Sequence, residues 1–288
     1  MAAFIKGKEL CRGFFEQVAK PILDRRFPGL EYSAGLLGYG SDVLGYDDAV
    51  STDHMWGPRF YLFLREEDKA LQLQILKAFS QEFPYTYRGY SVHFSRPDPN
   101  DKGIRHAEAI TQGQVDPLIF FHTFEEYLDF YLGTHHPETL TDVEWLSLPE
   151  HHLLALAKGE FYVDMLHCQE RLEPLRFYPE NVWLYLVASC WSLVAEEQAF
   201  VKRCASVGDS LGSALVCGRI AERLMRLCFL YCRQYAPYSK WFGTAFQQLP
   251  IPQELKDAIG AAVAATDTAQ REDNLVRAQQ LTAQLHNS

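Results

Sequence analysis

The sequence lacks the long apolar runs that a membrane protein requires. Its hydrophobic stretches, of which Phe60–Leu64 is one, fall well short of the roughly 20 residues that a membrane-spanning helix needs. The opening stretch, MAAFIKGKEL, contains no long apolar segment of the kind found in a secretory signal. We therefore expect a soluble, cytoplasmic protein with no membrane partner.

Two common nucleotide-binding signatures are also missing. The sequence contains neither the GxxxxGK[ST] pattern of P-loop enzymes nor the GxGxxG pattern of dinucleotide-binding folds. It has seven cysteines but no CxxC pair. This pattern favours buried free thiols in a reducing compartment over a zinc site built from cysteines.

Positive charge is scarce. The chain has 27 Lys and Arg against 37 Asp and Glu, a formal net charge of −10, so nonspecific binding to nucleic acid or to an anionic membrane is not indicated. Apolar residues, by contrast, are plentiful: 48% of the 288 residues are hydrophobic and 14% are aromatic. A chain of this length and composition can bury one large core or two ordinary ones.

In the first half of the chain, segments with the sequence pattern of a helix alternate with segments that have the pattern of a strand. Apolar residues at helical spacing predict helices, and short apolar runs bounded by turn residues predict strands. The predicted elements, in order, are a helix at 4–27, strands at 33–39 and 58–65, a helix at 68–82, strands at 90–95 and 106–111, and a helix at 123–132.

The second half reads as helices alone. Breaks at prolines and a glycine separate predicted helices at 150–158, 180–206, 209–235, 238–248, 252–265 and 269–286. We therefore expect an α+β protein with a mixed-sheet N-terminal domain over residues 1–145 and an all-helical C-terminal bundle over residues 146–288.

Residues 38–64, GYGSDVLGYDDAVSTDHMWGPRFYLFL, place several carboxylates directly before a buried-looking strand. A Gly-Ser turn after a strand, here Gly40-Ser41, exposes N–H groups and a hydroxyl that suit phosphate oxygens. Asp53, about a dozen residues later, enters the adjacent strand and can face the same cleft. A carboxylate placed there would hold Mg²⁺, which bridges the phosphates of a nucleotide.

This arrangement resembles the motif of the nucleotidyltransferase superfamily, in which a Gly-Ser turn precedes two acids separated by one residue. Acids two apart on a strand point to one face. Here Asp53 supplies the first acid, but Met55 stands at the second position, and a thioether cannot replace a carboxylate toward Mg²⁺. A third acid usually comes from a neighbouring strand, and Glu108 fits that role. Asp53 and Glu108 are therefore the expected metal ligands and catalytic residues.

These aspartates can also have purely structural roles. Asp is common in turns because its side chain bonds its own backbone. Asp47-Asp48 can therefore be an exposed turn, Asp53 a cap residue, and Asp42 a brace of the Gly-Ser turn. Alternatively, one of Asp42, Asp47 and Asp48 replaces the acid missing at Met55, or the site binds nucleotide without a full metal pair.

Several longer segments resemble a bacterial and fungal family known only as a domain of unknown function, numbered four-zero-three-seven. They are GSDVLGYDD, STDHMWGPRFYLFL, GYSVHFS, FYPENVWLYLVASCW, GDSLGSALVCGRIAERLMRLCFL and RQYAPYSKWFGTAF. The resemblance implies a nucleotidyltransferase-like N-terminal domain followed by a helical C-terminal domain. It implies no substrate.

A cationic stripe stands out in the helical half. Arg219, Arg223 and Arg226 share one helical face, and guanidinium groups bind phosphate or carboxylate through two hydrogen bonds. These arginines either recognise an anion or form ion pairs with neighbours such as Glu222 or with acids of the first domain. Two further cations are expected at the phosphates of a nucleotide, Arg59 and Lys240.

We therefore expect a nucleotidyltransferase-like protein that moves a nucleotidyl group from an NTP to a small-molecule hydroxyl with Mg²⁺ and releases pyrophosphate. Gly40 and Ser41 would hold the phosphates, and Glu108 would hold metal or accept the hydroxyl proton. The alternatives are a non-catalytic nucleotide-binding or ligand-sensing protein, for which Met55 is the evidence, and a protein-interaction module formed by the helical half. The expected partners are a nucleotide and an acceptor in a cleft between the domains, without nucleic acid.

Overall fold

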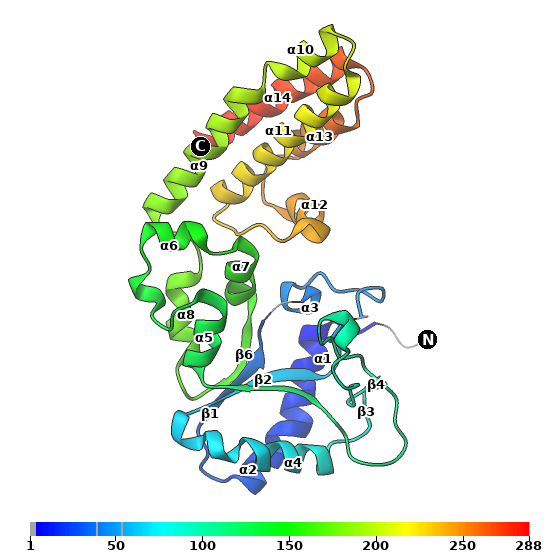
Figure 1. The fold of residues 1–288 in the computed structure, drawn as a ribbon, viewed down its shortest axis with the longest axis vertical. Helices are drawn as coiled ribbons and strands as arrows, with labels where there is room; N and C mark the ends of the chain where they lie inside the picture. Colours follow the sequence, from blue (N-terminus) through cyan, green and yellow to red (C-terminus); the bar gives the residue numbers. More distant parts are fainter. Residues whose placement is uncertain (1–3, 39, 53, 288) are drawn as a thin grey trace. The chain divides into compact units, whose positions relative to one another are not determined.

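The computed structural model describes residues 4–38, 40–52 and 54–287 (Figure 1). The chain forms two compact units, the first comprising residues up to 140 together with 152–176, and the second comprising 141–151 together with 177–288. The expected boundary near 145 is therefore wrong in one respect. The chain enters the second unit after residue 140 but returns to the first, because residues 152–176 include a strand of its sheet.

The first unit contains a four-stranded mixed sheet, which confirms the α+β class. Its strands lie in the order β5-β2-β1-β6. Strand β1 pairs antiparallel with both β2 and β6, whereas β2 and β5 are parallel. The bounds are β1 Tyr32–Leu36, β2 Arg59–Leu64, β5 Leu118–His122 and β6 Glu160–Asp164.

Helices and short segments complete this unit. They are α1 Gly7–Phe14, η1 Phe15–Ala19, α2 Lys20–Arg26, α3 Ser41–Leu44, η2 Glu66–Leu71, α4 Gln72–Glu82, β3 Thr86–Tyr87, β4 Tyr90–Ser91, η3 Pro99–Asp101, α5 Phe124–Leu132, η4 Pro137–Thr139, α8 Cys168–Leu172 and η5 Glu173–Leu175. Helix α7, Glu150–Lys158, begins in the second unit and ends in the first.

Two predicted strands are corrected. The strand expected at 90–95 is a two-residue strand, β4, and the one expected at 106–111 is absent; a single bridge joins Phe94 to Ala107. In turn, β5 and β6 were not predicted. Both have partly exposed side chains along most of their length, so they lack the continuous apolar run that identifies β2.

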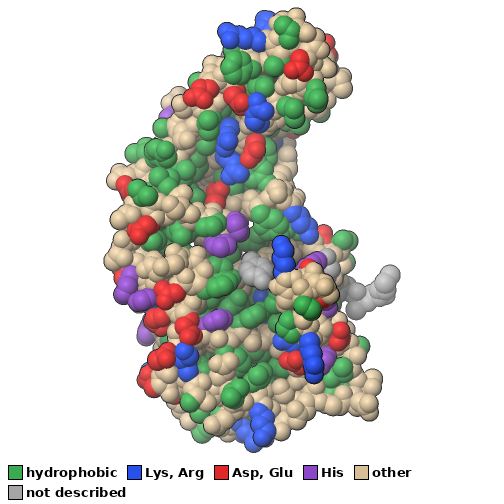
Figure 2. All heavy atoms as spheres, in the orientation of Figure 1, with side chains coloured by type: hydrophobic (Ala, Val, Ile, Leu, Met, Phe, Trp, Pro, Cys, Tyr) green, Lys and Arg blue, Asp and Glu red, His purple; other side chains and the backbone are tan. Residues whose placement is uncertain are grey.

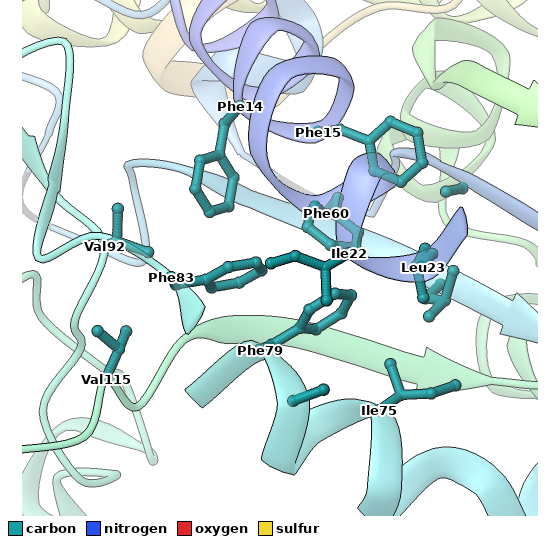
Figure 3. Packing of buried hydrophobic residues seen from close by; sticks show 14 of the residues in the cluster. Phe14, Phe15, Ile22, Leu23, Phe60, Ile75, Phe79, Phe83, Val92 and Val115 are labelled. Atoms are coloured by element: carbon teal, nitrogen blue, oxygen red, sulfur yellow. The ribbon is translucent and has the colours of Figure 1, made fainter. Parts of the chain in front are cut away.

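Strand β2 is buried on both faces, and this double burial explains its unbroken apolar sequence. Successive side chains of a strand point to opposite faces of the sheet, so Phe60 and Leu62 lie on the same face, in the core with α1 and α4. Figure 3 is a close view of this core. Tyr61 and Phe63 face the opposite side, where both pack edge-to-face against Tyr127 of α5, with ring centroids 5.4 and 5.3 Å away.

The predicted N-terminal helix is present, with a widened turn at its centre. Helices α1 and α2 are joined without a break by η1, a π-helical turn. We attribute this turn to Pro21, which has no N–H to donate to the carbonyl four residues earlier and whose ring would clash with it. Phe14 and Phe15, on either side of the junction, are fully buried against the sheet.

The second unit is helical throughout. Its elements are α6 Asp142–Ser147, α9 Glu180–Glu197, α10 Phe200–Ser206, α11 Ser210–Tyr231, α12 Ser239–Gln248, α13 Gln253–Ala264 and α14 Thr268–His286. Helix α11 contacts α9, α10, α12, α13 and α14, and its buried side chains form the centre of the bundle. Among the described residues, no helix combines the length and apolar character needed to cross a membrane.

We predict that Gly35→Ala lowers the stability of the protein. A Cβ at Gly35 would lie 2.2 Å from the main-chain oxygen of Glu160, so β1 and β6 would have to separate. Overpacking of this kind costs roughly 1–3 kcal/mol. The control is Gly218→Ala in helix α11, where a Cβ meets open space. Because alanine has a higher helix propensity than glycine, this change should raise the free energy of unfolding by about 0.5–1 kcal/mol. Chemical denaturation measures both, and equal effects from the two changes would contradict the close approach.

Candidate functional site

The Gly-Ser turn follows strand β1 as the sequence predicts. Gly38 and Gly40 have φ angles of 82° and 144°, and Ser41 is the half-buried first residue of the short helix α3. A Cβ at Gly40 would lie 2.3 Å from Oδ1 of Asp42, so both backbone angle and space require glycine. Within the described part of the chain, the N–H groups of Gly40 and Ser41 donate no hydrogen bond to another residue.

A buried ion pair holds this turn against strand β2. Arg59, 4% exposed, donates from Nε and Nη2 to the carboxylate of Asp42, 3% exposed, at 3.0–3.1 Å. Burial alone would lower the pKa of Arg59, but the attraction and hydrogen bonds of Asp42, together with the charges of Cys11 and Tyr61, outweigh it and raise that pKa. Asp42 is therefore a brace of the turn, one of the two roles that the sequence left open. A phosphate contact of Arg59 stays a prediction.

Two further aspartates have structural contacts. Asp47 is fully buried, and its Oδ2 accepts hydrogen bonds from the N–H of Gly7 at 2.7 Å and from Nε1 of Trp56 at 3.0 Å. It therefore caps helix α1 from a distant part of the chain, where a negative charge is favourable. Asp48 is exposed, and its Oδ1 accepts from the N–H groups of Val50 and Ser51, as expected for a turn.

The proposed metal ligands are only partly described. Asp53 lies outside the described residues. Glu108 is exposed in a loop rather than on the predicted strand, and its main chain bonds to His93 and Ser91. The strand argument for its direction is therefore wrong, although its role as a ligand stays a prediction. Within the described ranges, no group of three or more His, Cys, Asp or Glu is arranged to hold a metal ion.

Met55 lies in the same loop, at the position of the missing acid. Its φ angle is 48°, in the left-handed region, and its N–H donates to the carbonyl of Arg105 at 3.2 Å. A regular strand places residues two apart on one face, but position 55 lies in a loop before β2 begins. The structure therefore does not place Met55 on a strand face beside Asp53.

A pocket of about 370 Å³ adjoins this loop. Its walls combine aromatic rings with small side chains: Phe4, Ala49, Thr52, Trp56, Gly57, Tyr90, Ser91 and Ala107. The rings are mutually packed, with Trp56 stacked on Phe4 at 5.4 Å and edge-to-face with Tyr90 at 5.0 Å. The lining is mainly apolar, and its position next to Thr52 places it at the start of the segment that contains Asp53.

Two of the arginines in the cationic stripe form ion pairs within the second unit. Arg219 bonds to Glu197 at 2.7 Å, and Arg226 bonds to both Glu150 and Glu222 at 3.1 Å. On the face of this unit seen in Figure 2, Lys and Arg side chains lie beside Asp and Glu side chains. The ion-pair alternative therefore accounts for these two residues.

The remaining predicted cations differ from one another. Arg223 is half-buried, and no ion pair joins it to an acid in the described part of the chain. Lys240 is exposed in the first turn of α12, with Nζ 4.9 Å from the ring centroid of Trp241. Anion binding by either residue stays a prediction.

Residues 208–212, GDSLG, fit the GxSxG pattern of serine hydrolases, so the expectation that the sequence contains no such pattern was wrong. That pattern is catalytic where the serine stands on a sharp turn from a strand to a helix. Here helix α10 precedes the segment, Ser210 opens helix α11, and Asp209 caps it by accepting from the N–H of Gly212 at 2.7 Å. We therefore assign this segment a helix-capping role.

Comparison with known proteins supports part of these expectations. Residues 145–242 match the model of a family described as "Domain of unknown function (DUF4037)". The resemblance stated above is confirmed over that segment, which runs from α6 to the start of α12 and includes β6. The Gly-Ser turn and the Asp53 loop lie outside it. No curated protein matches the chain.

Among solved structures, the chain is similar to a nucleotidyltransferase-like protein from Exiguobacterium sibiricum 255-15. The sequence identity is 10% and the TM-score 0.37, over 94% of this chain and 75% of that chain. A likeness of this degree carries no argument about function. The α+β class rests on the strands and helices described above.

We predict that Asp42→Asn destabilises the protein by about 3–5 kcal/mol, because it removes the carboxylate charge that is paired with the buried guanidinium of Arg59. The matched control is Glu31→Gln. Glu31 pairs with Arg65 just beyond the other end of strand β2, and both side chains are about half exposed. That pair should contribute less than about 1 kcal/mol. Urea denaturation compares the two, and a small effect of Asp42→Asn would contradict the bracing role.

We predict opposite results for two neighbouring arginines. Arg226→Ala should cost about 1–2 kcal/mol, because it removes two ion pairs, one of them to the half-buried Glu150. Burial raises the pKa of Glu150, while the N–H of Ala236 and Arg226 oppose that rise, so removing Arg226 raises it further. Arg223→Ala should leave the melting temperature nearly unchanged. A lower nucleotide affinity for Arg223→Ala alone would assign it an anion-binding role.

Proposed function

We propose that the first unit binds the phosphates of a nucleoside triphosphate at the Gly40-Ser41 turn and transfers its nucleotidyl group to the hydroxyl of a small molecule. The acceptor oxygen forms a bond to the α-phosphorus, the bond from that phosphorus to pyrophosphate breaks, and the hydroxyl proton passes to a base. Glu108, whose side chain is exposed in the neighbouring loop, is the proposed base.

The observation that carries this proposal is the geometry of the turn. The N–H groups of Gly40 and Ser41 are available for an anion, and the Asp42–Arg59 pair fixes them in place before any ligand arrives. Consecutive N–H groups in such a turn form a concave site for phosphate oxygens. A site that is ordered in advance loses less free energy on binding than one that must be ordered by its ligand.

The adjoining pocket offers a place for the base of the nucleotide. Aromatic side chains stack on nucleobases with little regard to their identity. The pocket is lined by three aromatic residues, and its volume of about 370 Å³ exceeds that of a single base. We therefore include it in the proposal as the base-binding part of the site.

Mg²⁺ is a further expectation. The described residues do not supply a magnesium site on their own, because Asp42 and Asp47 are engaged in structural bonds and Glu108 is exposed alone. The first predicted ligand, Asp53, is outside the described residues. If Asp53 and Glu108 hold Mg²⁺, the ion would neutralise charge on the phosphates.

Met55 favours a second candidate function, non-catalytic binding of a nucleotide. The superfamily motif requires a carboxylate at this position, and a thioether offers no hard oxygen to a metal. A protein of this kind would keep the phosphate-binding turn and bind a nucleotide as a signal rather than as a substrate. Release of pyrophosphate in the presence of small hydroxyl compounds separates an enzyme from a sensor.

We predict that Met55→Asp increases the Mg²⁺-dependent affinity for ATP, because it supplies a hard oxygen ligand at the position where the superfamily motif has its second acid. Isothermal titration with and without Mg²⁺ is the measurement, combined with an assay for pyrophosphate. Met165→Asp is the control, since Met165 is 47% exposed elsewhere in the same unit and should change neither quantity. An unchanged metal dependence of Met55→Asp would show that position 55 does not face the cation.

A further inference from the structure

Two lysines lie side by side in the first unit. Lys8, in the first turn of α1, is half-buried, and its ammonium group donates a hydrogen bond to the main-chain carbonyl of Lys158 at 2.9 Å. Lys158 is the exposed last residue of helix α7, and only Gly159 separates it from strand β6. Two groups of like charge therefore share one small area of a chain whose net charge is −10.

Neither lysine forms an ion pair with a described residue. The acids nearest to them in sequence have other partners: Glu160 accepts from Nε of Arg12 at 2.8 Å, and Glu9 pairs with Arg88 at 3.2 Å. Burial lowers the pKa of Lys8; the attraction of Glu160 opposes this effect and the repulsion of Lys158 adds to it. Asp42 and Asp47 also attract Lys8, but in the described part of the chain no carboxylate bonds to its ammonium group.

Lys8 stands beside the Gly-Ser turn. Its chain neighbour Gly7 packs so closely on helix α3 that a Cβ there would lie 2.5 Å from Cβ of Asp42, the residue after Ser41. The charge of Asp42 also acts on the pKa of Lys8. The first turn of α1 and the turn that holds Ser41 are thus in direct contact.

Lys158 also lies close to the same turn. In the sheet, Glu160 pairs with Leu36, the last residue of β1 before the turn. A Cβ at Gly159 would lie 3.2 Å from Cγ of Leu37. Lys158 therefore lies where the chain leaves β1 and enters the Gly-Ser turn.

We propose that Lys8 and Lys158 form a cation pair that binds the phosphates of the nucleotide held at the Gly40-Ser41 turn. This inference rests on the proposed function. The oxygens of a triphosphate accept hydrogen bonds from ammonium groups, and these charge-assisted bonds are strong. A bound triphosphate would replace the carbonyl of Lys158 as the partner of Lys8. It would also remove the repulsion between the two lysines.

Isothermal titration of the full chain with ATP and with inorganic tripolyphosphate tests the cation pair. Lys8→Gln should weaken binding of both ligands about ten- to a hundredfold, the loss of one charge-assisted hydrogen bond. Lys8→Arg should keep most of the affinity because it keeps the charge. Lys158→Gln should cause a smaller loss, since its ammonium group is exposed. Lys20→Gln is the matched control: Lys20 pairs with Asp24 on helix α2 and should not affect affinity.

The two ligands separate the possible failures. If Lys8→Gln binds ATP and tripolyphosphate as the natural chain does, the cation pair is overturned and nucleotide binding stands. If tripolyphosphate binding depends on Lys8 but ATP binds no better and no pyrophosphate is released, the anion site stands and the nucleotide function is overturned. If the natural chain binds neither ligand, both are overturned. Should Lys8→Gln not fold, the loss of affinity in Lys158→Gln decides the question.

Discussion

The buried pair between Asp42 and Arg59 is the constraint on which the N-terminal half of the site depends. A guanidinium and a carboxylate removed from water must stay together, because either one alone would be a costly buried charge. Arg59 opens strand β2, and Asp42 follows the Gly-Ser turn. The pair therefore ties the loop after one strand to the beginning of the next, and it fixes the N–H groups of the turn at the end of strand β1.

Much of the fold could be predicted from the sequence where one physical signal dominates. Strand β2 is buried on both faces, so its apolar run is unbroken. Helices α11 and α14 carry long helical patterns, and each begins at an aspartate N-cap. Strand β6 could not be found in this way. Its residues EFYVD are partly exposed and short, and β1 pairs with it only through a stretch of chain that returns after a helix of the other unit.

In the candidate site, the Gly-Ser turn could be predicted from the sequence, whereas the roles of the aspartates could not. Gly40-Ser41 needs a backbone that only glycine adopts, and that requirement is visible in the sequence. The neighbouring aspartates look alike in a sequence, yet Asp42 and Asp47 are buried in structural bonds while Asp48 is exposed. Whether a given carboxylate stabilises the fold depends on its bonding partners far along the chain, such as Arg59 and Gly7. The spacing of residues in the sequence does not identify these partners.

The path of the chain between the two units limits how this protein can be divided. Three covalent connections join them, at residues 140–141, 151–152 and 176–177. A gene fragment that ends before residue 160 would encode β1 without its neighbour β6, leaving a bare sheet edge beside the Gly-Ser turn, and unpaired edges of this kind favour aggregation. No single cut of the chain separates the two units, so they are expected to have been inherited together.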